Sequence, residues 1–196
     1  MEEVAPAVGV TDAEIRAEAA SDEAVDQGLS HDRLLLALLR VLERVSPFHG
    51  SQIIRFLPQA FVYFNRASAT EDIDKIVLPA LTAGPCIVVS HSLGTIVTFK
   101  ILRDAAAAGR VPFYTTLGSP LPLKAVMHAI GPAFGRPAAV SSSLNGLDPN
   151  DAVTIGRSLT VATFGSGIDN IDDIDNGNED PHDVRKYLRV VASLKR

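Results

Sequence analysis

The spacing of apolar residues changes partway through the segment 84–102. A continuous apolar run at 86–89 lies between a Gly-Pro pair and a polar Ser-His-Ser sequence, a pattern typical of a buried strand. After Ser92 the apolar positions recur at helical spacing, at Leu93, Ile96, Val97, Phe99, Leu102 and Ala105. The pattern therefore predicts a strand, a sharp turn centred on Ser92, and then a helix.

Helical patterns dominate the chain before this segment. A leucine-rich stripe at 34–45 follows Ser30, an N-cap residue, and a second apolar stripe follows Ser51. Pro58 is expected to break that helix, kink it, or open a separate short one. A further helix is predicted from Thr70 to Gly84. The pattern thus predicts a helical segment ahead of the first strand.

Strands and helices alternate after the Ser92 turn. Strands are predicted at 111–117, 139–147 and 158–164, helices at 123–130 and 181–194, and a polar loop at 165–180. Such alternation indicates βαβ crossovers. We therefore expect an α/β fold with a mainly parallel sheet and flanking helices.

Composition and charge narrow the class of protein. The chain has 196 residues, of which 46% are hydrophobic, and a net charge of −5, which does not favour a nucleic-acid surface. Acidic residues concentrate in 1–30, which we expect to be a mobile arm ahead of a domain at 31–196. The single cysteine, Cys86, is expected to be a small core residue. With neither a signal peptide nor a membrane span visible, a cytoplasmic location is expected.

The Ser92 turn has the features of a nucleophile elbow. A serine at such a bend has its hydroxyl above the end of a sheet, close to the N–H groups of the following helix. Ser90 and Gly94, two residues to either side, are both small, as a strained turn with close strand and helix packing requires. The segment resembles the elbow of the α/β-hydrolase superfamily, specifically that of its lipase-like and esterase-like serine hydrolases. The resemblance covers residues 59–196.

The resemblance implies the order serine, acid, histidine along the chain. Only His128 and His182 follow Ser92; His128 lies inside a predicted helix, whereas His182 lies where the last loop meets the last helix. We expect His182 to be the base, with Asp180 as N-cap and Pro181 opening that helix.

A candidate for the acid of this series lies in a loop after the strand predicted at 139–147. The sequence Asp-Pro-Asn-Asp-Ala-Val at 148–153 resembles the acid loop of this hydrolase group, which implies that Asp151 is the triad acid and that Asp148 shapes the turn. Both aspartates could also be simple turn formers. The acidic residues at 169–180 match no metal-binding template, so a solvated loop is expected there and no cofactor or metal.

An oxyanion hole needs two N–H donors. The backbone amide of Leu93, directly after Ser92, is expected to be one. The His49-Gly50 pair, a common mark of the second, lies between predicted helices and is interpreted as a connecting turn. The early strands of the hydrolase fold have no counterpart in 1–58, so a partial fold is expected. The leucine-rich helix, a second copy of the chain or a partner chain would then cover the exposed sheet edge.

These features predict a serine hydrolase that cleaves a carboxylic ester or related acyl bond through an acyl-enzyme. The expected substrate is a small-molecule or lipid-like acyl ester, because the neighbouring segments are apolar. Two alternatives remain open: an acyltransferase with the same residues, and a catalytically impaired remnant that serves as an interaction module.

Overall fold

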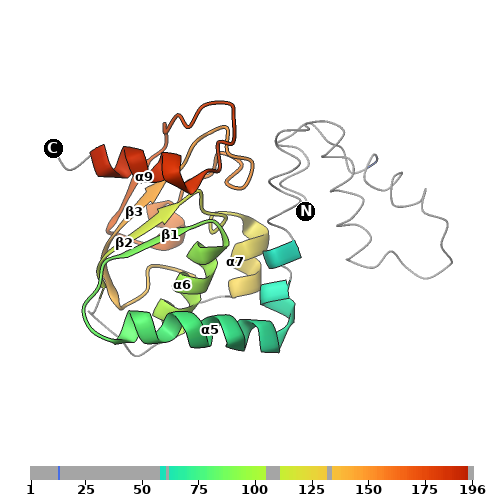
Figure 1. Ribbon diagram of the computed structural model, residues 1–196, viewed down its shortest axis with the longest axis vertical. Helices are drawn as coiled ribbons and strands as arrows, with labels where there is room; N and C mark the ends of the chain where they lie inside the picture. The colour runs from blue at the N-terminus through green and yellow to red at the C-terminus, as the bar shows by residue number, and fades with distance from the viewer. Residues whose placement is uncertain (1–12, 14–57, 61, 105–110, 132–133, 194–196) are drawn as a thin grey trace. The chain divides into compact units, whose positions relative to one another are not determined.

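The computed structural model describes residues 13, 58–60, 62–104, 111–131 and 134–193 (Figure 1). All of these except Ala13 belong to one compact unit, Phe56–Arg196. The helices predicted at 34–45 and after Ser51, the pair His49-Gly50 and, apart from Ala13, the acidic arm at 1–30 lie outside the described residues.

The described unit is an α/β fold built on a parallel sheet, as the sequence predicts. Its strands are β1 Val88–His91, β2 Val111–Leu117, β3 Val140–Gly146 and β4 Ile168–Ile171, in the order β1-β2-β3-β4. All pairs are parallel. The helices are α5 Ala67–Thr82, α6 Leu93–Asp104, α7 Lys124–Ile130, α8 Val161–Phe164 and α9 Val184–Ser193.

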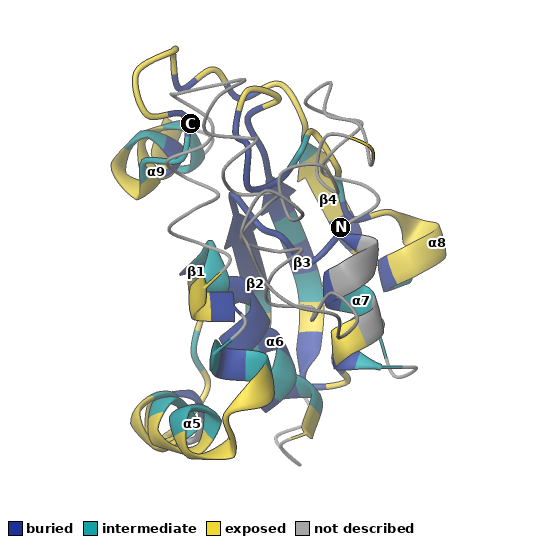
Figure 2. Cartoon of the chain, turned by 90° about the vertical axis from the view of Figure 1, so that its right-hand side faces the viewer, coloured by how far each residue is buried: buried dark blue, intermediate teal, exposed yellow. Residues whose placement is uncertain are grey.

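The two faces of the sheet have separate cores. Figure 1 shows α5 and α6 on one side of the sheet and α9 on the other. The larger core includes Ile96, Phe99 and Leu102 of α6, whereas a smaller one joins Leu117, Ile174 and Tyr187 beneath α9. Figure 2 shows buried residues along most of β2, with exposed residues on the outer side of α5.

The register of the sheet brings the carboxyl ends of all strands to one level. His91 pairs with Leu117, Leu117 with Gly146, and Gly146 with Ile171. The residues that follow these positions therefore leave the sheet at a common rim. Ligand sites of parallel sheets form at this edge, because the loops there converge.

The prediction of a buried strand at 86–89 is wrong in its burial and its limits. The strand begins at Val88, so Cys86 precedes it and is only partly buried, packed against the core. Ile87 is 65% exposed and Val89 50% exposed. Among the described strands β1 pairs only with β2, and only the face that carries Val88 is covered, so the apolar run has one buried face instead of two.

The prediction also fails between 158 and 171. In the expected strand at 158–164, residues 158–160 have no regular secondary structure, and the short helix α8 follows, which begins with a reciprocal capping box between Thr160 and Thr163. The expected loop at 165–180 contains β4, because Ile168 and Ile171 pair with β3.

Helix limits differ by a few residues from those predicted. The helix α5 begins at Ala67 instead of Thr70 and includes Pro79, and α9 begins at Val184 instead of Pro181. Residues 58–60 and 62–65 are helical, and the residues before Pro58 lie outside the described part of the chain. His182 therefore lies in the turn before α9, and Asp180, at φ 53°, precedes that turn.

Candidate active site

Ser92 occupies a strained turn at the carboxyl end of β1. Its φ of 52° lies in the left-handed region, which is costly for a residue with a side chain. The turn is fixed by a bond from its N–H to the Leu117 carbonyl at 3.1 Å and by Thr95, whose hydroxyl donates to the Ser92 carbonyl at 2.7 Å. These bonds hold the serine between β1 and α6, as the strand-turn-helix pattern predicts.

The small residues around the turn have different roles from those expected. Ser90 is buried and donates to the Thr115 carbonyl at 3.1 Å, which ties β1 to β2. A Cβ added at Gly94 meets no described atom within 4 Å, so nothing in the described residues requires a glycine there. The expectation that Gly94 must be small for packing is therefore wrong for this part of the chain.

Leu93 is the first residue of α6. Its N–H has no carbonyl within the helix to bond, because the first four N–H groups of a helix lack helical acceptors. Such a donor, at the positive end of a helix and directly after the serine, can stabilise a developing negative charge.

Asp151 and His182, predicted as a pair, are hydrogen-bonded. His182 Nδ1 lies 2.7 Å from Asp151 Oδ2, and the Asp151 side chain is fully buried. The second carboxylate oxygen, Oδ1, accepts from the Val153 N–H at 2.9 Å. A buried carboxylate bonded in this way fixes the orientation of the imidazole and stabilises it once it becomes protonated.

Tyr187 of α9 is a further partner of Asp151 that the sequence did not indicate. Its hydroxyl donates to Asp151 Oδ2 at 2.7 Å and accepts from the Asp148 N–H at 3.0 Å. Burial, followed by the charge of Asp151, raises the pKa of Tyr187, so the hydroxyl remains a donor. Tyr187 thus links the acid loop to the helix that follows His182.

Asp148 shapes the acid loop, as predicted. Its carboxylate is buried and accepts from the N–H groups of Asn150 and Asn176, each at 2.7 Å. These bonds fold the loop back on itself and connect it to the segment that leads to His182.

Gly118, the first residue after β2, packs directly against the Asp151 and His182 pair. A Cβ at this position would lie 2.9 Å from Asp151 Oδ2 and 3.1 Å from His182 Nδ1. Its φ of 51° also favours glycine. The close approach of the backbone therefore depends on the absence of a side chain.

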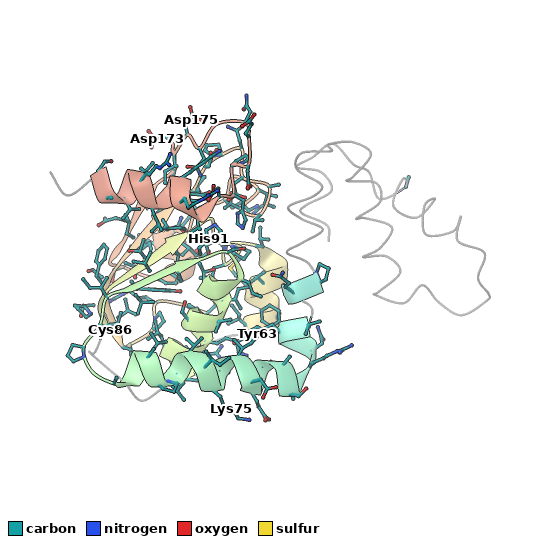
Figure 3. All side chains as sticks on the ribbon, viewed as in Figure 1. Tyr63, Lys75, Cys86, His91, Asp173 and Asp175 are labelled. Atoms are coloured by element: carbon teal, nitrogen blue, oxygen red, sulfur yellow. The ribbon has the colours of Figure 1, made fainter. Side chains whose placement is uncertain are left out.

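His91 connects the two parts of the site. It directly precedes Ser92, and its ring centroid lies 4.4 Å from that of His182. In Figure 3 His91 lies at the end of β1 nearer α9, whereas Cys86 lies near α5. Within the described residues the Ser92 hydroxyl has no hydrogen-bond partner. The two parts are joined by the His91 ring on His182. They are also joined by Leu117, which accepts from the Ser92 N–H and directly precedes Gly118.

The other histidine that follows Ser92 is His128. His128 lies on α7, and the Asp151 carboxylate is bonded by His182 instead. The described residues contain no group of three or more His, Cys, Asp or Glu that could hold a metal ion. The helices among them include none that is long and apolar enough to cross a bilayer.

An open, apolar cavity of about 420 Å³ includes Leu93 in its lining. Its lining consists of Leu93, from the start of α6, and residues of the preceding helices: Pro58, Gln59, Val62, Tyr63 and Ile73. The cavity therefore touches the residue whose amide directly follows Ser92.

Comparison with protein-family models gave no match, and comparisons with curated proteins and with solved structures gave none either.

Proposed function

We propose that this chain is a serine hydrolase of the α/β-hydrolase type that cleaves a carboxylic ester or a related acyl bond. The observation that carries the proposal is the bond between His182 and the buried Asp151 at the same sheet rim as the strained Ser92 turn. A serine, a carboxylate and an imidazole, contributed by separate loops in this order along the chain, are the parts of a catalytic triad.

The proposed reaction assigns one role to each group. Ser92 attacks the substrate carbonyl while His182 Nε2 takes the serine proton, and the Leu93 N–H stabilises the resulting oxyanion. His182 then donates that proton to the leaving alcohol, and an acyl-enzyme remains. Water, activated by His182 in the same way, releases the acid. The Ser92 hydroxyl is without a bond among the described residues, and catalytic hydrogen bonds often form only once substrate binds.

The apolar cavity beside Leu93 supports an apolar acyl group. Its volume of about 420 Å³ lies within the range of small-molecule pockets, and its lining contains a single amide side chain, Gln59. An acyl chain in this cavity would contact Leu93, the residue that directly follows Ser92.

Hydrolysis of p-nitrophenyl esters of graded chain length tests the proposal. The wild-type chain should release p-nitrophenol and favour medium over acetyl chains, whereas Ser92→Ala should release it no faster than buffer. Ser141→Ala, an exposed serine of β3, is the matched control and should retain the wild-type rate. Equal rates for Ser92→Ala and the wild type would reject the proposal.

A further inference from the structure

His91 is a titratable residue that the proposed mechanism does not use. It ends β1, and its ring packs on the His182 ring, with centroids 4.4 Å apart and planes 38° apart. The ring of Tyr187 lies on a further side, with its centroid 5.8 Å away. The Nε2 atom of His91 is buried and has no hydrogen-bond partner among the described residues.

Asp151, Gly118 and His91 lie against the His182 ring in the described part of the chain. Asp151 Oδ2 binds Nδ1 at 2.7 Å, and the backbone of Gly118 approaches so closely that a Cβ there would lie 3.1 Å from Nδ1. The His91 ring contacts His182 from a third element, β1. Asp151 and Gly118 both act near Nδ1, so the packing of His91 supplies a constraint that neither of them provides.

His91 is uncharged at neutral pH. Burial, followed by the charge of the nearby His182, lowers its pKa to about 4, whereas Asp151, Asp183 and a hydrogen bond to the His182 backbone act in the opposite direction. The neighbouring Tyr187 hydroxyl is also neutral, since its pKa is raised. A neutral ring can therefore pack on His182 without repelling the positive charge that forms when His182 accepts the serine proton.

We infer that His91 is a positioning residue: its flat, uncharged ring forms a wall that holds His182 with Nδ1 on Asp151 and leaves Nε2 available to Ser92. The inference rests on the proposed function, because it concerns the base of that reaction. It assigns the main effect to the ring face of His91, and it treats the hydrogen bond from the His91 ring to the His182 backbone as a smaller contribution that His91→Phe removes.

Two substitutions separate the ring face from the nitrogens. His91→Phe keeps a flat ring without a titratable group, whereas His91→Ala removes the wall. Val89→Ala, an exposed position on the same strand, is the matched control. The first readout is the low-field proton resonance of a hydrogen-bonded His182 Nδ1–H, assigned by its loss in His182→Gln. The second is the rate at which a fluorophosphonate labels Ser92.

We expect His91→Ala to lose the resonance and to be labelled about 10- to 100-fold more slowly, because small displacements of reacting groups have effects of this size. His91→Phe should keep the resonance and label within about threefold of the wild type, and Val89→Ala should match the wild type. If circular dichroism shows that His91→Ala does not fold, the results for His91→Phe alone decide whether the inference holds.

Either of two results would overturn the inference. One is a His91→Ala variant that keeps both the resonance and the wild-type labelling rate. The other is a folded His91→Phe variant that loses the resonance or whose labelling rate is as low as that of His91→Ala. A wild-type chain that shows the resonance but is not labelled at Ser92 would reject the proposed hydrolase. The resonance of His91→Ala and His91→Phe would still test whether the His91 ring positions His182.

Discussion

The two sides of the candidate site differ in how well their groups are satisfied. On the Ser92 side, a serine lies at φ 52°, and the preceding His91 has a buried nitrogen without a partner among the described residues. On the Asp151 side, both carboxylate oxygens accept hydrogen bonds, and the residue is fully buried.

The difference indicates how the site divides its tasks. Strained backbone persists only where the surroundings determine it, and such strain gathers where a group must be presented for reaction. The densely bonded acid loop provides a fixed reference for the imidazole. Under the proposed function, the Ser92 side presents the nucleophile and the Asp151 side holds the imidazole in place, and each prediction below perturbs one side while sparing the other.

The largest expected effect comes from crowding the rigid side at Gly118. In Gly118→Ala the new Cβ meets Asp151 Oδ2 at 2.9 Å, and the left-handed φ adds strain. We expect a loss of about 2 to 4 kcal/mol in the free energy of unfolding, measured by urea denaturation. Gly94→Ala, where a Cβ meets no described atom within 4 Å, should be neutral or stabilising by up to about 1 kcal/mol. Equal stability losses in the two variants would contradict the packing described for Gly118.

Removing the Tyr187 hydroxyl should have the next largest effect. Tyr187→Phe deletes a bond to a buried carboxylate and leaves the Asp148 N–H without its acceptor. The expected cost is about 1.5 to 3 kcal/mol in unfolding free energy, because the lost bond is to a charged group.

Tyr114→Phe is the matched control for Tyr187. The Tyr114 hydroxyl is also buried but donates to a neutral carbonyl, that of Thr95, at 3.0 Å. Its loss should cost about 1 kcal/mol and leave fluorophosphonate labelling unchanged. If Tyr187→Phe is no less stable than Tyr114→Phe, the hydrogen bond from Tyr187 to the Asp151 carboxylate contributes no more to stability than a bond to a neutral carbonyl.

The pH dependence of stability tests the Ser92 side. The pKa of His91 is about 4 in the folded chain against 6.5 for a free histidine, so the unfolded chain binds the proton more readily between these values. The stabilisation that the neutral His91 ring gives the folded state is therefore fully present above pH 6.5 and is lost as the pH falls toward 4. Between pH 7 and pH 5 the wild type should lose about 2 kcal/mol more than His91→Phe. Parallel pH profiles in urea denaturation would contradict this.

The smallest effect isolates the backbone strain at Ser92. Both Ser92→Gly and Ser92→Ala remove the hydroxyl, but only glycine adopts a φ of 52° without steric cost. Ser92→Gly should be more stable than Ser92→Ala by about 1 kcal/mol in thermal unfolding, although glycine ordinarily costs entropy. A less stable glycine variant would mean that the turn is not strained.

Local signals explain what the sequence predicted well. The strand at 111–117 carries β-branched and aromatic residues and appears with the predicted limits, and the change in spacing at Ser92 marks the strand, turn and helix. The choice of Asp151 and His182 rested on the resemblance, through the sequence of the acid loop at 148–153 and the order serine, acid, histidine that the resemblance implies, and the structure joins these two side chains.

Non-local contacts explain what the sequence did not predict. Pairing with β3 makes a strand of 168–171, a polar segment without a strong pattern of its own. The exposure of Val89 depends on which elements cover β1, and the contacts of Gly118, Tyr187 and His91 exist only once distant segments meet. These properties arise from tertiary packing, which periodicity along a chain does not encode.

The most direct test of the account is to map the adduct formed by a fluorophosphonate probe. Intact-mass and peptide analysis should find a single adduct, on Ser92, that forms rapidly in the wild type and far more slowly in His182→Gln, because the imidazole must take the serine proton. An unmodified Ser92 in the folded wild-type chain, or equal labelling in His182→Gln, would contradict it.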